Sequence, residues 1–351
     1  MTPARWTAVI AVILSVAAAA GAFAAVRLTR SDPAVADASW VASAPAKRVE
    51  SGSTDPLGDD YDLVHLVDPA RTEVRRRDGD KMLATLTVGA RTVVFAGAPR
   101  RFTDPSTTSA VVDSAVRVRI APRAWRIDPT PDDVVAWLLR QLEDEDPPID
   151  VLGAAMQYLA DAPDRRDSRG VRYAGDADFG YVHSRDERDG ADFYDFLEIP
   201  WDFPDSGRRR PSERWHKDLD CSGYLRLIYG YRFGIPLLNG KVNATVDGLP
   251  RTAASMAAYA RSVTVAAGRS PSRPPKDLSA LQPGDIAFFA LHDDPALVTH
   301  SGIYIGDDGD GRMRFISSRG TVDGPSFGDV RGDSVLDSGY FGDRLRRVIR
   351  L

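Results

Sequence analysis

Apolar side chains recur at helical spacing in the stretch that follows Asp220. The apolar residues on one face of this segment are Tyr224, Leu225, Leu227, Ile228 and Tyr231. Asp218 and Asp220 can accept hydrogen bonds from the free N–H groups of a first helical turn. The run Phe233-Gly234-Ile235-Pro236 is typical of a helix end. The pattern therefore predicts a buried helix that begins at Cys221 and ends before Phe233.

Three apolar runs in the last third of the chain predict strands. A Pro283-Gly284 turn leads into the run from Ile286 to Phe289, and a second run extends from His300 to Ile305. Gly302 interrupts the second run, and a glycine inside a strand permits close approach of a neighbouring group. The third run, residues 312–320, follows an acidic, glycine-rich turn. It is therefore expected to form a hairpin with the second run.

The segment before residue 128 alternates in the way that favours β-structure. Short runs rich in β-branched residues lie at residues 82–88, 92–96 and 115–120. They predict a small β-rich domain at residues 55–127, either a sandwich or an SH3-like barrel. Two amphipathic helices are expected next, at about residues 131–142 and 150–159, packed beside the helix that begins at Cys221.

An apolar run of residues 7–26 opens the chain, flanked by arginines at positions 5, 27 and 30. It is long enough to span a bilayer. It also fits a signal peptide, because Ala34-Val35-Ala36 offers a small-x-small cleavage site. Residues 1–30 are thus predicted to be a membrane anchor or a signal peptide, and residues 31–54 a flexible linker. Both alternatives export the remaining chain to the cell envelope.

Composition excludes several classes of function. The chain of 351 residues carries 45 basic and 50 acidic side chains, which does not favour a nucleic-acid partner. There is no glycine-rich phosphate loop, so nothing indicates a nucleotide, and we expect no cofactor. One cysteine forms no internal disulfide, and the five histidines lack the spacing of a metal-binding helix. No metal site is expected.

The single cysteine, Cys221, is the candidate nucleophile. At the first turn of a helix, free N–H groups and the positive end of the helix dipole favour thiolate over thiol. His300, on a later strand, is the candidate base. A buried free cysteine is also a common inert core residue, and the helix alone does not separate the two interpretations.

Together these stretches resemble the NlpC family of cell-wall cysteine peptidases. The resemblance rests on Asp220-Cys221-Ser222-Gly223, on residues 281–289 with their Pro-Gly-Asp turn, and on His300 to Gly306. It covers roughly residues 150–351. It implies an α+β fold in which helices pack on an antiparallel, papain-like sheet, so residues 128–351 are the expected catalytic domain, with core motifs at 218–351. The chain end resembles the closing strand of the family.

The resemblance also implies roles for individual residues. Cys221 and His300 would be the catalytic pair. Ser317 stands where the family usually has a histidine, and would orient the imidazole as the third catalytic residue. Asp220 and Ser222 would bind the free amino end of a short wall peptide. The implied activity is hydrolysis of amide bonds in peptidoglycan stem peptides.

Two alternatives remain open at this point. One is a catalytically lapsed relative that binds the cell wall, since a serine stabilises an imidazolium less well than a second imidazole does. The other is an amidase or acyltransferase of the same fold that acts on a non-peptidoglycan amide or ester.

Overall fold

The computed structural model describes residues 47–49, 57–67, 69–79, 81–181, 190–240 and 246–351. These residues belong to one compact unit that spans residues 38–351. The predicted anchor or signal peptide lies outside the described residues. Among the described residues, no helix is both long enough and apolar enough to cross a membrane.

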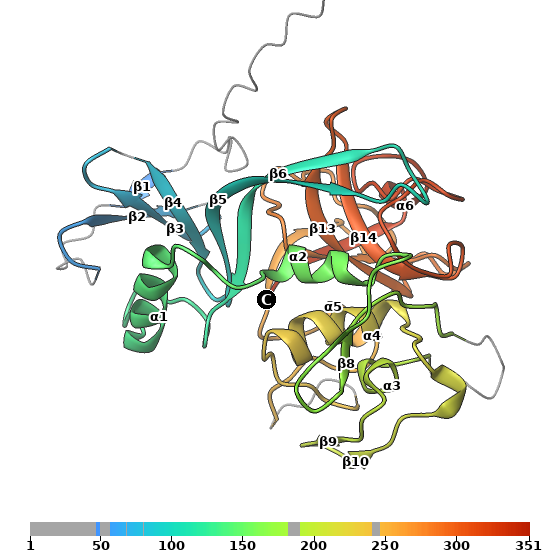
Figure 1. The fold of residues 1–351 in the computed structure, drawn as a ribbon. Coiled ribbons are helices and arrows are strands. Elements are labelled where there is room, and N and C mark those ends of the chain that lie inside the picture. The colour runs from blue at the N-terminus through green and yellow to red at the C-terminus, as the bar shows by residue number, and fades with distance from the viewer. Residues whose placement is uncertain (1–46, 50–56, 68, 80, 182–189, 241–245) are drawn as a thin grey trace, which may run out of the picture. The chain divides into compact units, whose positions relative to one another are not determined.

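The first sheet is a meander. In chain order, its described strands are β1 (Lys47–Val49), β2 (Tyr61–Val67), β3 (Arg71–Arg76), β4 (Met82–Thr87), β5 (Thr92–Thr103) and β6 (Val111–Ile120). Each pairs antiparallel with the next (Figure 1). The described strands thus form neither the second layer of the predicted sandwich nor a β6–β1 pairing that would close a barrel. β1 lies within the predicted linker. The sequence did not reveal it, because three residues are too few to show the alternation of a strand.

Helix α1 (Asp132–Glu143) packs on this first sheet. Its buried residues Val134 and Leu138 share an apolar cluster with Val74 and Phe95 of the sheet. The expectation that this helix packs beside the one beginning at Cys221 was therefore wrong. Its apolar stripe predicts that it packs, but the stripe carries no information on which apolar surface it meets.

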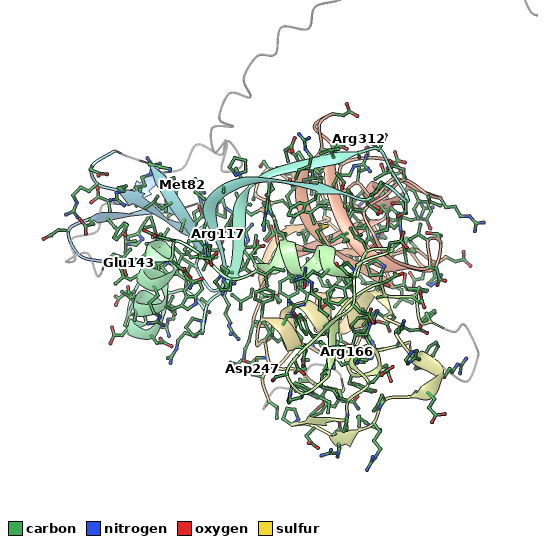
Figure 2. All side chains as sticks on the ribbon, in the orientation of Figure 1. Met82, Arg117, Glu143, Arg166, Asp247 and Arg312 are labelled. Carbon is green, nitrogen blue, oxygen red and sulfur yellow. The ribbon has the colours of Figure 1, made fainter. Side chains whose placement is uncertain are left out.

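The second sheet, as far as it is described, has the strand order β11-β16-β12-β13-β14-β15. Its strands are β11 (Val263–Ala267), β12 (Ile286–Phe289), β13 (His300–Asp307), β14 (Met313–Arg319), β15 (Gly324–Ser326) and β16 (Leu345–Arg350). The predicted hairpin is confirmed as β13 and β14, which pair antiparallel; Arg312, labelled in Figure 2, lies in its turn. The closing strand is confirmed as β16, paired with β12.

Short elements make up the rest of the described chain, and two of the helices, α4 and α5, pack on this sheet. The helices are α2 (Val151–Ala155), the 3-10 turns η2 (Met156–Tyr158) and η3 (Glu213–Trp215), α3 (Phe193–Leu197), α4 (Cys221–Leu225), the π-helix η4 (Arg226–Arg232), α5 (Ala253–Ala257) and α6 (Gly339–Gly342). Two small hairpins join β7 (Arg165–Arg166) to β8 (Arg172–Ala174), and β9 (Trp201–Phe203) to β10 (Gly207–Arg209). Helices on an antiparallel sheet confirm the α+β class.

The β5–β6 hairpin reaches the second sheet. At its tip, Asp104 Oδ2 accepts a hydrogen bond of 2.7 Å from the Ser326 hydroxyl. Thr107 Oγ1 lies 2.9 Å from the same hydroxyl. Ser326 is the register partner of Ser317, which the sequence predicts as a site residue. The β-rich segment therefore supports the strand that carries Ser317.

Candidate active site

The helix that carries the cysteine begins where the sequence predicts. Asp220 is its N-cap, and Asp220 Oδ1 accepts a hydrogen bond of 2.6 Å from the backbone N–H of Gly223. Cys221 is the first residue of α4, which continues into η4. At Gly223, a Cβ atom would lie 2.4 Å from the carbonyl oxygen of Ala191. Because Gly223 has no side chain, the backbone just before α3 can pack directly against the helix.

His300 and Ser317 are brought together. His300 is the first residue of β13 and is buried. Its Nε2 lies 3.1 Å from Ser317 Oγ, and its ring centroid lies 5.9 Å from that of Phe289 and 6.0 Å from that of Phe341. A hydroxyl that accepts from Nε2–H leaves Nδ1 as the basic nitrogen of the ring. The serine thus has the position of an orienting residue.

The imidazole is held neutral. Burial lowers the pKa of His300 to about 3, and the nearby guanidinium of Arg319 lowers it further in the same direction. A buried cationic imidazole would lose its hydration and meet a like charge. At neutral pH the imidazole is therefore uncharged, and its free ring nitrogen can act as a base.

Cys221 faces Ser301 rather than His300 in the described contacts. α4 packs against β13. Because strand residues alternate between faces, Ser301 shares a face with Ile303 and Ile305, which lie in one apolar cluster with Tyr224 and Leu225 of the α4 helix.

His300 has the opposite parity, that of Tyr304, which clusters with Phe289 and Phe315. Among the described hydrogen bonds none joins Cys221 to His300; the groups that lower the pKa of the Cys221 thiol include the Ser301 hydroxyl and backbone N–H.

The thiol is protonated in this arrangement, contrary to the sequence-based expectation. Burial raises the pKa of the Cys221 thiol to about 12, and the neighbouring Asp220 carboxylate raises it further. The hydrogen bonds from Ser301 and the charge of Arg251 act in the opposite direction but are outweighed. The position at the helix start favours a thiolate. The loss of hydration and the negative charge of Asp220 outweigh this effect and keep the thiol protonated.

Asp220 and Ser222 are both bonded to Arg251. The Arg251 guanidinium donates 2.7 Å and 3.3 Å hydrogen bonds to the two oxygens of Asp220, and one of 2.8 Å to Ser222 Oγ. It also donates to the Gly190 carbonyl at 2.6 Å. If Asp220 and Ser222 bind a substrate amino group as predicted, their side-chain oxygens must accept hydrogen bonds from that group and from Arg251 at the same time.

Sequence reasoning did not single out Ser301, Arg251 or Arg319. Ser301 lies inside the His300-Ser301-Gly302 motif, so its hydroxyl was visible but its face was not considered. Arg251 follows Leu249-Pro250 without a periodic signal. The motif glycine Gly302 was correctly expected to permit close approach, since a Cβ there would lie 2.6 Å from the Phe315 ring.

The described residues contain no group of three or more histidine, cysteine or acidic side chains arranged to hold a metal ion.

Asp218, two residues before the helix cap, gives a pH prediction. Burial raises its pKa to about 6, with Asp178 and Asp323 adding like charge. The folded chain therefore retains a proton that the unfolded chain loses near pH 4, so this residue lowers stability as the pH rises from about 4 to 6. Asp218→Asn should raise the melting temperature at pH 7 by roughly 1–3 °C, because a half-buried group contributes under about 1 kcal/mol.

Calorimetry at pH 4 and pH 7 measures this effect. The variant should gain more at pH 7 than at pH 4, while Asp293→Asn on an exposed loop should gain equally little at both. An Asp218→Asn gain that is the same at both pH values would contradict the raised pKa.

Comparisons with known proteins add little. No family model and no curated protein matches the sequence. A solved structure from Staphylococcus aureus, described as similar to lipoprotein and of the NLP/P60 family, is 19% identical over 64% of this chain, with a TM-score of 0.27. The chain spans 50% of its length. NlpC2 from Trichomonas vaginalis is 14% identical over 87% of this chain and 92% of its own, with a TM-score of 0.29.

Proposed function

We propose that this protein is an exported cysteine peptidase that hydrolyses amide bonds in peptidoglycan stem peptides. The observation that carries the proposal is that Cys221 begins a helix that packs on β13, the strand whose first residue, His300, contacts Ser317. The substrate class comes from the resemblance to the NlpC family alone. Export rests on the apolar run of residues 7–26, which lies outside the described residues.

The proposed mechanism starts from a neutral pair. The thiol of Cys221 attacks the carbonyl carbon while its proton passes to Nδ1 of His300, and Ser317 holds the ring through Nε2. The C–N bond of the amide then breaks, and the amine leaves with the proton from Nδ1, which gives a thioester on Cys221. Water hydrolyses this thioester, with one proton passing to the sulfur, so that the acid product and the free thiol are released. The backbone N–H of Cys221 is the proposed oxyanion donor. Catalytic hydrogen bonds are often long before substrate binds, so the proposal requires His300 to approach the sulfur in the complex.

The proposed peptide contacts use Asp220 and Ser222. Each carboxylate oxygen can accept about two hydrogen bonds, so Asp220 Oδ2 can take one from a substrate ammonium in addition to the one from Arg251. This places the free amino end of a stem peptide near the first turn of α4.

Digestion of purified peptidoglycan tests the function. The released fragments, analysed by mass spectrometry, should each have gained one water at an amide between two stem-peptide residues. No fragments from peptidoglycan, together with cleaved or acylated products from candidate lipids or non-wall amides, would instead indicate the amidase or acyltransferase alternative.

A catalytically lapsed wall-binding protein is the second candidate. It is favoured by the protonated thiol, the neutral imidazole and the absence of a described bond between them. Sedimentation with insoluble cell wall, together with no released fragments, would select this candidate.

A further inference from the structure

Ser301 is a buried hydroxyl without an assigned role. Its side chain is fully buried, and among the described residues its Oγ has no hydrogen-bond partner. A buried hydroxyl without a partner costs about 1–3 kcal/mol. A valine or alanine at position 301 would avoid that cost, so we expect the Ser301 hydroxyl to have a function.

Its placement is set by the strand. The register of β13 with β14 extends from Ile303 to Asp307, so it does not include Ser301. Ser301 has the same parity as Ile303 and therefore faces the helix that Cys221 begins. Cys221 is the first residue of that helix, which packs against β13, and Ser301 is among the groups that act on its thiol.

We propose that the Ser301 hydroxyl donates a hydrogen bond to the sulfur of Cys221 and thereby sets how readily this thiol reacts. The bond is stronger to a negative sulfur than to a neutral thiol, so it is formed most fully as the proton leaves. Its catalytic meaning rests on the proposed peptidase function; the bond itself does not.

Two charged side chains also act on the Cys221 thiol. Asp220 opposes ionisation of the thiol and Arg251 favours it. The His300 ring contacts Ser317, and Arg319 at the end of β14 is bonded to the Gly328 and Gly332 carbonyls. Asp220 outweighs Arg251 in its effect on the thiol. Ser301 is a neutral donor, so its removal changes neither of these charges and its own effect can be measured.

The matched pair Ser301→Thr and Ser301→Val tests the proposal, because the two side chains have nearly the same shape and differ in the hydroxyl. The full chain is alkylated with iodoacetamide at pH 9, where the rate reports the thiolate fraction. The valine variant should react about tenfold more slowly than the threonine variant, the effect of losing one hydrogen bond to a charged group. The threonine variant should react at nearly the parental rate.

Ser334→Ala is the control, since Ser334 is an equally buried serine whose hydroxyl bonds the Gly328 carbonyl instead. It should alkylate at the parental rate. Equal rates for the valine, threonine and parental proteins would overturn the inference. The assay uses no wall substrate: slowed alkylation without peptidoglycan cleavage would retain this inference and reject the proposed function, and the converse result would do the reverse.

Discussion

Replacing Cys221 by alanine is expected to abolish the release of new amino termini from purified peptidoglycan. The thiol is the nucleophile of the proposed acyl-enzyme route, and no second cysteine is present in the chain to replace it. We expect a loss of at least roughly a thousandfold in rate, as for removal of a catalytic nucleophile in other hydrolases. An amine-reactive fluorophore measures the termini.

Folding should survive this change. The alanine removes one partly buried sulfur, so the melting temperature followed by circular dichroism should remain within a few degrees of the parent. Cys221→Ser supplies a matched control that keeps the shape but is a weaker nucleophile, and should also be inactive. Equal release by the parent and the folded alanine variant would dispose of the nucleophile assignment.

Asp285→Ala is expected to produce the largest loss of stability. The two oxygens of Asp285 accept bonds of 2.7 Å from Nε and 2.7 Å from Nη2 of Arg350, and both side chains are buried. The substitution leaves a buried guanidinium without its counter-charge, at a cost of about 3–5 kcal/mol. It also removes the acceptor of the Gln282 N–H at the Pro-Gly turn. The free energy of unfolding, measured in urea, should fall by that amount.

Two comparisons isolate the buried charge as the cause. Asp113→Ala breaks an ion pair with Arg101 in which both side chains are exposed, and should cost less than about 1 kcal/mol. The double variant Asp285→Leu with Arg350→Met should recover much of the loss, because it removes both charges together. A loss in Asp285→Ala no larger than in Asp113→Ala would refute the explanation.

Local signals accounted for most of the framework around the site. The cap at Asp220, the apolar spacing after it and the Pro-Gly turn before β12 each act within a few residues, so the sequence shows them directly. The hairpin that joins His300 and Ser317 follows from two strands and the turn between them.

The errors arose where distant parts of the chain meet. The stripe of α1 was recognised, but its partner is the first sheet. The three residues of β1 are too few for a pattern and become a strand only because β2 offers its edge. The bond between Arg251 and Asp220 joins segments separated by 31 positions.

The sequence by itself determined where Cys221, His300 and Ser317 lie along the elements, because capping and periodicity are properties of neighbouring residues. Only the tertiary structure decided that the thiol is protonated, that the imidazole is neutral and that Ser301 meets the sulfur. Those outcomes depend on burial and on charges contributed by other strands and loops. Desolvation in particular has no counterpart in a short stretch of sequence, since water is excluded only when the whole fold closes around a group.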